Sequence, residues 1–138
     1  MLARLITLHD ELFAAIAGLS ALTEGGLPDR SRLADQRLLL SRASAARSRL
    51  LELEIYPHLL ATLSGEDALA VRRLRTEALA LRITSGGHVG RWTIDAAMDD
   101  WPGYCQASRA MRAAMRQQIG AEQNLLYRLL ETQAHEAA

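Results

Sequence analysis

The sequence predicts an all-α protein, a single up-down-up-down antiparallel four-helix bundle that spans residues 1–138. Apolar residues recur at steps of three and four along four segments, which is the spacing of one helix face. Hydrophobic residues make up 49% of the chain but aromatic residues only 4%, and a core of Leu, Ala, Ile and Met favours helices over strands. Short connections between the segments are typical of antiparallel neighbours in a bundle.

The first helix is predicted over residues 2–22. Its inward stripe contains one histidine among apolar residues, at Leu2, Leu5, His9, Leu12, Ile16 and Leu19. The stretch Gly25-Gly26-Leu27-Pro28 then breaks the chain. Asp29 or Ser31 is expected to cap the second helix.

The second helix is predicted from about Arg30 to Leu63, and two overlapping stripes are compatible with it. The first stripe consists of Leu33, Leu40, Ser44, Arg47 and Leu51. The second, which is more like a core face, consists of Ala34, Leu38, Ser41, Ala45, Ser48, Glu52, Ile55 and Leu59. Pro57 lies inside the pattern and is expected to kink or bend the helix near its end.

The third helix is predicted from about Glu66 to Met98, with Ser64 as its cap and an acidic first turn. Its stripe is Val71, Leu74, Ala78, Leu81, Ser85, His88 and Trp92. Gly86-Gly87 and Gly90 lie within it, and each internal glycine costs roughly 1 kcal/mol relative to alanine. We therefore expect this segment either to bend or to break into two helices.

The fourth helix is predicted from about Tyr104 to Leu130, with Pro102 in its first turn and Asp100 as its cap, and the tail beyond it is expected to fray. Its inward stripe is Tyr104, Met111, Met115, Gln118, Glu122, Leu125 and Leu129. The polar pair in the middle of this stripe is costly unless another side chain, a water or a metal ion satisfies it.

Antiparallel packing places residues that are equally far from a connection at one level of the bundle. Counting along the chain puts His9, the region Arg47–Glu52, Ala78 and the pair Gln118 and Glu122 in one layer. At a rise of about 1.5 Å per residue, an error of three residues would shift this register by about one turn.

At this layer the chain resembles the hemerythrin-like (HHE cation-binding) domains over nearly its whole length. The resemblance rests on four stretches, Leu8-His9-Asp10-Glu11-Leu12, Leu51-Glu52-Leu53-Glu54-Ile55-Tyr56-Pro57, Thr76-Glu77-Ala78-Leu79 and Ile119-Gly120-Ala121-Glu122-Gln123-Asn124-Leu125-Leu126-Tyr127. It implies a four-helix bundle with a non-heme di-iron centre that binds oxygen or senses oxygen, nitric oxide or redox state. The iron ligands of the family are about five histidines and acidic residues that follow the second-helix and fourth-helix histidines by four or five positions.

Most of these ligands are replaced here. His9 matches the first-helix histidine, whereas the other three helices place Arg47, Ala78 and Gln118 at the matching positions. A remnant metal site would consist of His9, Glu122 and Glu52, which is a poor donor set for iron beside a cationic arginine. We interpret the level instead as a hydrogen-bonded polar layer of His9, Arg47, Glu52, Gln118 and Glu122, in which the arginine donates to its neighbours.

The preferred function is a non-enzymatic interaction or signalling protein, related to stress, with a degenerate metal centre and no cofactor. The alternative is an iron-binding protein with a reduced His/Glu site that senses oxygen, nitric oxide or redox state. No catalytic or cofactor-binding residue is predicted, because the sequence has no nucleophile–base pair, phosphate-binding loop or zinc spacing.

Charge and hydropathy constrain the partners. The chain has 16 arginines, no lysine and 16 acidic residues, so it has no basic surplus to attract nucleic acid. Without an apolar run of about 20 residues or a signal peptide, we expect no membrane partner and a cytoplasmic location. Trp92, Trp101 and Tyr104 are expected to pack near one end, or to form a homodimer contact if exposed. Whether the partner is a protein or a small molecule is left open.

Overall fold

A computed structural model describes residues 1–137, which form helices and turns with no strand among them. The predicted all-α class is therefore confirmed. The helices are α1 (Leu2–Glu24), α2 (Arg30–Leu50), the π-helical turn η1 (Leu51–Ile55), α3 (Tyr56–Thr62), α4 (Gly65–Arg91), α5 (Ile94–Asp99) and α6 (Trp101–Ala137).

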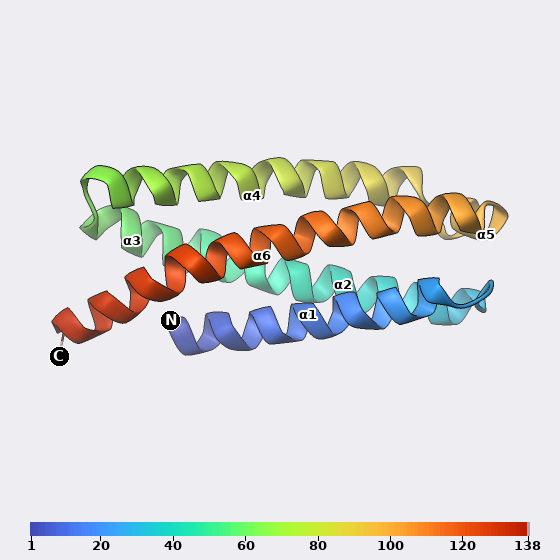
Figure 1. Cartoon of the computed structure of the whole chain (residues 1–138), viewed down its shortest axis with the longest axis horizontal. Coiled ribbons are helices and arrows are strands. Elements are labelled where there is room, and N and C mark those ends of the chain that lie inside the picture. The colour runs from blue at the N-terminus through green and yellow to red at the C-terminus, as the bar shows by residue number, and fades with distance from the viewer. Residues whose placement is uncertain (138) are drawn as a thin grey trace.

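The four long helices α1, α2, α4 and α6 extend along the long axis of the molecule (Figure 1). The chain runs outward along α1, returns through α2, η1 and α3, runs outward again along α4, and returns along α6. α1 packs on α2 and α6, and α4 packs on α6 and α3. Packing between α2 and α4 is sparse by comparison, which leaves space between these two helices.

The predicted stripe of the first helix is correct. Its residues from Leu5 to Leu19, together with Leu22, are buried. By length and composition alone α1 could cross a membrane, but core helices of globular proteins pass the same test, and α1 uses its buried face to contact α2 and α6. The side chain of Asp29 caps α2, since its Oδ1 accepts a hydrogen bond of 3.0 Å from the Ser31 N–H.

The preference for the second of the two stripes in the second helix was wrong. The first stripe faces inward, with Leu33, Arg47 and Leu51 buried, whereas Leu38 of the other stripe is 48% exposed. Steps of four residues drift by about 40° per step in a regular α-helix, and the wider π turn offsets this drift. This widening keeps Ile55 and Leu59 buried in line with Arg47 and Leu51.

The irregularity expected at Pro57 takes the form of this π turn. Pro57 has no N–H and its ring crowds the carbonyl of the residue four positions earlier. The N–H of Tyr56 donates to the carbonyl of Leu51, five residues back, as in a π-helix. Pro57 itself lies in the first turn of α3, a position that tolerates proline.

The third predicted helix breaks, but not at its glycines. α4 continues through Gly86, Gly87 and Gly90 to Arg91, and the chain bends at Trp92 and Thr93. The hydroxyl of Thr93 then accepts a hydrogen bond of 3.1 Å from the N–H of Ala96 and caps α5. Ser64 occupies the capping position of α4 without making a side-chain hydrogen bond.

The last helix is longer than expected at both ends. It begins at Trp101, where Asp100 caps it as predicted by accepting a 3.1 Å hydrogen bond from the Gly103 N–H. The expectation that the chain frays after Leu130 was wrong, since α6 continues to Ala137. Burial of Leu130 and a 2.5 Å hydrogen bond from Gln133 to the hydroxyl of Thr62 hold this extension against α3.

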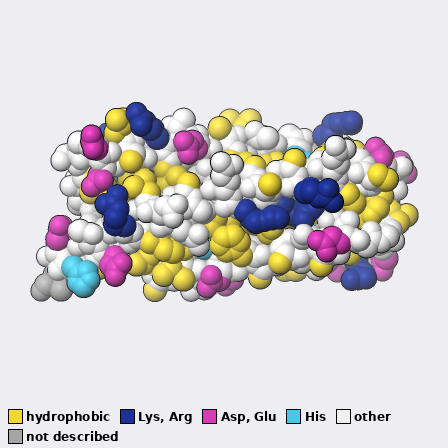
Figure 2. All heavy atoms as spheres, in the orientation of Figure 1, with side chains coloured by type: hydrophobic (Ala, Val, Ile, Leu, Met, Phe, Trp, Pro, Cys, Tyr) yellow, Lys and Arg dark blue, Asp and Glu magenta, His cyan; other side chains and the backbone are white. Residues whose placement is uncertain are grey.

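The core forms three clusters along the molecule, and Figure 2 shows one side of its surface. The largest cluster joins α1, α3, α4 and α6 around Tyr56 and Leu126. On the face in Figure 2, acidic and basic side chains are intermingled with apolar ones, without a continuous basic band.

Candidate functional site

Glu122 on α6 is the centre of a buried polar layer and is completely inaccessible to solvent. Its Oε1 accepts hydrogen bonds of 2.8 Å from Nε2 of His9 and 2.8 Å from Nε of Arg47. Its Oε2 accepts from the Nη2 of Arg47 and, at 3.2 Å, from Nε2 of Gln118. An ionised carboxylate offers about four acceptor sites, so donors from the protein fill all of them.

The second ring nitrogen of His9, Nδ1, lies 2.6 Å from the hydroxyl of Tyr127. Because an ionised Glu122 only accepts, His9 donates through Nε2, and in the neutral ring Nδ1 accepts from the tyrosine. Sequence periodicity missed Tyr127, since it follows Glu122 by five residues and so lies on a neighbouring face of α6. The long side chain of Tyr127 reaches back to the layer across this offset.

The ion pair between Arg47 and Glu122 stays charged at neutral pH. Burial alone would raise the pKa of Glu122, but the hydrogen bonds from Arg47 and His9 outweigh it and lower this pKa. Burial likewise opposes the charge of Arg47, and its hydrogen bonds to Glu122 outweigh that effect and raise the pKa of the guanidinium. This pair therefore places a buried cation next to a buried anion.

α4 contributes backbone rather than a side chain to this layer. The carbonyl of Leu74 accepts a 3.5 Å hydrogen bond from Gln118. Ala78, one turn later, lines a small cavity of about 50 Å³ together with Arg47. The counted register is thus accurate to about one turn of helix.

Glu52 is the predicted layer residue that the structure places elsewhere. It follows Arg47 by five residues, and Leu50 and Leu51 take the inward positions between them. Its carboxylate instead forms an ion pair with Arg75 of α4, with a separation of 3.0 Å, and remains partly exposed. The structure therefore brings together His9, Arg47, Gln118 and Glu122 but not Glu52.

The donor set does not fit the iron centre that the resemblance implies. Among residues 1–137, no three His, Cys, Asp or Glu side chains converge as a metal site. Iron needs several nitrogen and oxygen donors, whereas His9 and Glu122 are already hydrogen-bonded to each other. The cationic Arg47 in contact with both carboxylate oxygens would also repel a metal ion.

One polar atom near the layer has no hydrogen-bonding partner among the described residues. The hydroxyl of Tyr56, on the first turn of α3, is buried and unpaired there. Burial, together with the negative charge of Glu122, raises the pKa of this tyrosine. The Tyr56 hydroxyl is therefore neutral at physiological pH and does not act as a base.

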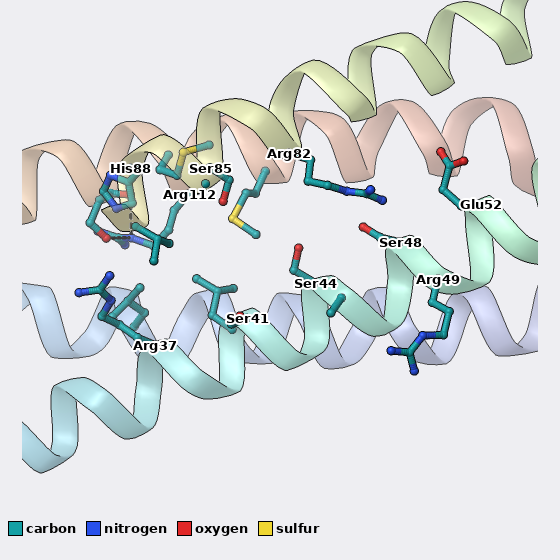
Figure 3. A pocket seen from close by; sticks show the side chains of 18 of the residues that line it. Arg37, Ser41, Ser44, Ser48, Arg49, Glu52, Arg82, Ser85, His88 and Arg112 are labelled. Carbon is teal, nitrogen blue, oxygen red and sulfur yellow. Dashed lines mark hydrogen bonds between the residues drawn. The ribbon is translucent and has the colours of Figure 1, made fainter. Parts of the chain in front are cut away.

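A separate pocket of about 750 Å³ lies between α2, α4 and α6, where the first two of these helices are apart (Figure 3). Three serines of α2, Ser41, Ser44 and Ser48, line one wall. Figure 3 shows Arg37, His88 and Arg112 gathered at one end, Arg82 farther along, and Glu52 with Arg49 toward the other end. The sequence did not predict this pocket, because four amphipathic stripes suggest four closely packed helices.

Comparisons of the chain with models of protein families, with curated proteins and with solved structures find no match.

Proposed function

We propose that this protein is a non-enzymatic binding protein, with an interaction or signalling role related to stress, built on a hemerythrin-like bundle without a metal centre. The observation that carries the proposal is the saturation of Glu122 by donors from His9, Arg47 and Gln118. A ligand position of the family is thereby converted into a structural hydrogen-bonded layer.

The alternating directions of α1, α2, α4 and α6 support an up-down-up-down antiparallel four-helix bundle (Figure 1). The positions that match the family's histidines also lie at about one level of the bundle. Three of them, His9, Arg47 and Gln118, donate hydrogen bonds to Glu122. Ala78 lies beside Arg47 in the adjoining small cavity. This agreement of register supports the hemerythrin-like assignment.

A binding role fits the closed layer better than catalysis does. His9 and Glu122 are fully buried, so a substrate has no access to the acid and base that they would supply. Equal numbers of basic and acidic residues, intermingled on the face in Figure 2, support a partner other than nucleic acid. The cytoplasmic location expected from the sequence is kept as part of this proposal.

The metal content of protein produced with added iron tests this proposal. We expect far less than one iron per chain, no charge-transfer bands in the visible spectrum, and the same melting temperature before and after chelation. Stoichiometric iron with such bands would instead support the alternative function, an iron-binding sensor that uses His9 and Glu122.

A gain-of-function variant tests the register. The triple substitution Arg47→His, Ala78→His and Gln118→His restores imidazoles at the three replaced positions and removes the cation. We expect this variant to bind iron that the parent does not retain. The variant with Ala78→His alone is the control, because it keeps Arg47 on Glu122. A folded triple variant that gains no iron would contradict the hemerythrin-like register.

A further inference from the structure

Arg112 on α6 is a buried cation without a buried anion. Its side chain is 3% exposed, and Nε donates at 3.2 Å to both the carbonyl and the hydroxyl of Ser108. Its Nη2 donates at 3.0 Å to the hydroxyl of Thr23. All these acceptors are neutral, and none of the ion pairs within residues 1–137 includes this arginine. Buried charges are normally paired, so Arg112 is an exception that calls for a counter-ion.

The two buried arginines differ in what surrounds them. Glu122 raises the pKa of Arg47, as described above. The pKa of Arg112 is lowered by burial and further by the charges of Arg116 and Arg109. The surroundings of Arg112 therefore leave its positive charge poorly compensated.

A second cation approaches the same place from α2. The guanidinium carbon of Arg37 lies 5.6 Å from the centre of the Tyr104 ring. Its Nη1 is buried and has no hydrogen-bonding partner within the described part of the chain. Figure 3 places Arg37, His88 and Arg112 at one end of the pocket, and the ring of His88 lies 6.1 Å from Tyr104.

Apolar side chains line much of the rest of the pocket, together with several serines. Apolar side chains that line it include Leu19, Leu40, Val89, Met111 and Met115. Its volume of about 750 Å³ is typical of small-molecule sites. Glu52, the acidic residue of the lining, lies at the opposite end and is engaged by Arg75 (Figure 3). Basic side chains are thus concentrated at one end, and the largely apolar lining that extends from it also includes Arg82 and Arg49 farther along (Figure 3).

We propose that this pocket binds an organic anion with an apolar chain, whose carboxylate or phosphate is held by Arg37 and Arg112. A guanidinium binds either acid group through paired, charge-assisted hydrogen bonds. The apolar chain lies along the methionine and leucine side chains of the pocket. This site is separate from the layer around Glu122. The proposal that it binds an anion therefore does not depend on the metal content of the protein.

Three probes with the same ten-carbon chain test the proposal, namely decanoate and decyl phosphate below their critical micelle concentrations and decanol below its solubility limit. Binding is measured by calorimetry and by tryptophan fluorescence, because the rings of Trp92 and Trp101 lie 5.9 and 5.5 Å from Tyr104. We expect saturable binding of at least one of the two acids. The alcohol should bind at least about tenfold more weakly, since it lacks the charge. Comparing the two acids identifies the preferred head group.

The variants Arg112→Gln and Arg37→Gln should each weaken binding of the acid by about tenfold or more. Arg42→Gln is the matched control, because this arginine is exposed on α2, outside the pocket, and should leave affinity unchanged. Circular dichroism checks the fold of each variant, and Arg37→Gln decides the matter if Arg112→Gln does not fold. Equal affinity for decanol, no saturation by either acid, or unchanged affinity in the arginine variants would overturn the proposal.

Discussion

Removing either partner of the ion pair between Arg47 and Glu122 would leave the other buried without an opposite charge. We expect Arg47→Met to lower the free energy of unfolding by about 3–5 kcal/mol, because it leaves a buried carboxylate without its cation. The loss is large beside the roughly 5–15 kcal/mol of a typical domain. Chemical denaturation measures it. Arg49→Met, at an exposed position two residues later, is the control and should change stability by less than about 0.5 kcal/mol.

The double variant Arg47→Met with Glu122→Leu completes this test. Replacing a buried pair by apolar residues is often close to neutral, so the double variant should be more stable than Arg47→Met alone. The free energy of unfolding is also measured for Glu122→Leu alone. If the loss in the double variant equals the sum of the losses in the two single variants, the two side chains are not coupled. An unchanged melting temperature for Arg47→Met would show that the guanidinium of Arg47 is solvated in the native protein.

Periodicity predicts the contacts of a residue when its position on the helix face decides them. It fails when a long side chain extends to a contact away from that face. Glu122 and Gln118 were predicted in the layer because they interrupt an apolar stripe. Tyr127 was missed because it reaches the layer from a neighbouring face. Arg112 was missed for another reason. Spaced three and four residues from Arg109 and Arg116, it resembles part of a solvated stripe, but it is buried and hydrogen-bonded to Ser108 and Thr23.

At the scale of elements, the sequence predicted the position of the irregularity at Pro57 but misplaced the interruption of the third helix. Pro57 marked the irregularity in the second helix correctly, but the π turn that precedes it depends on backbone relaxation that residue types do not specify. The glycines of α4 suggested a bend or a break at their positions, but the helix continues through them. The chain turns instead at Thr93, whose capping hydroxyl was the local signal for a new helix.

Gly87 is an internal glycine without a packing role. A Cβ atom at this position meets nothing within 4 Å, and the backbone is helical. Gly87→Ala should therefore raise the free energy of unfolding by about 0.5–1 kcal/mol, mainly by restricting the unfolded chain. Gly65→Ala is the contrasting control and should destabilise by about 1 kcal/mol or more, because Gly65 has a φ of +61°. Thermal melts of both variants check the prediction, and a lower melting temperature for Gly87→Ala would point to an unrecognised contact at this position.

At the scale of the whole molecule, burial is uneven along the bundle. The buried residues of α4 are Ala68, Val71 and Leu74, all in its first half, where α3 and α6 cover it. The second half borders the pocket and has no fully buried residue. The apolar stripes of α2 and α4 are weaker than those of α1 and α6, but periodicity gives only the direction of a face and not the distance to its neighbour.

This asymmetry predicts uneven local stability in α4. Amides of residues 82–88 should exchange with solvent at least about tenfold faster than those of residues 71–78, since few buried contacts oppose local opening there. Native-state hydrogen exchange measures both stretches, and residues 104–112 of α6 control for fraying near this end of the molecule. These control residues include the buried Tyr104, Ser108 and Arg112, so they should stay protected. Uniform protection along α4 would mean that it packs closely on α2 in solution and that the pocket between them is closed.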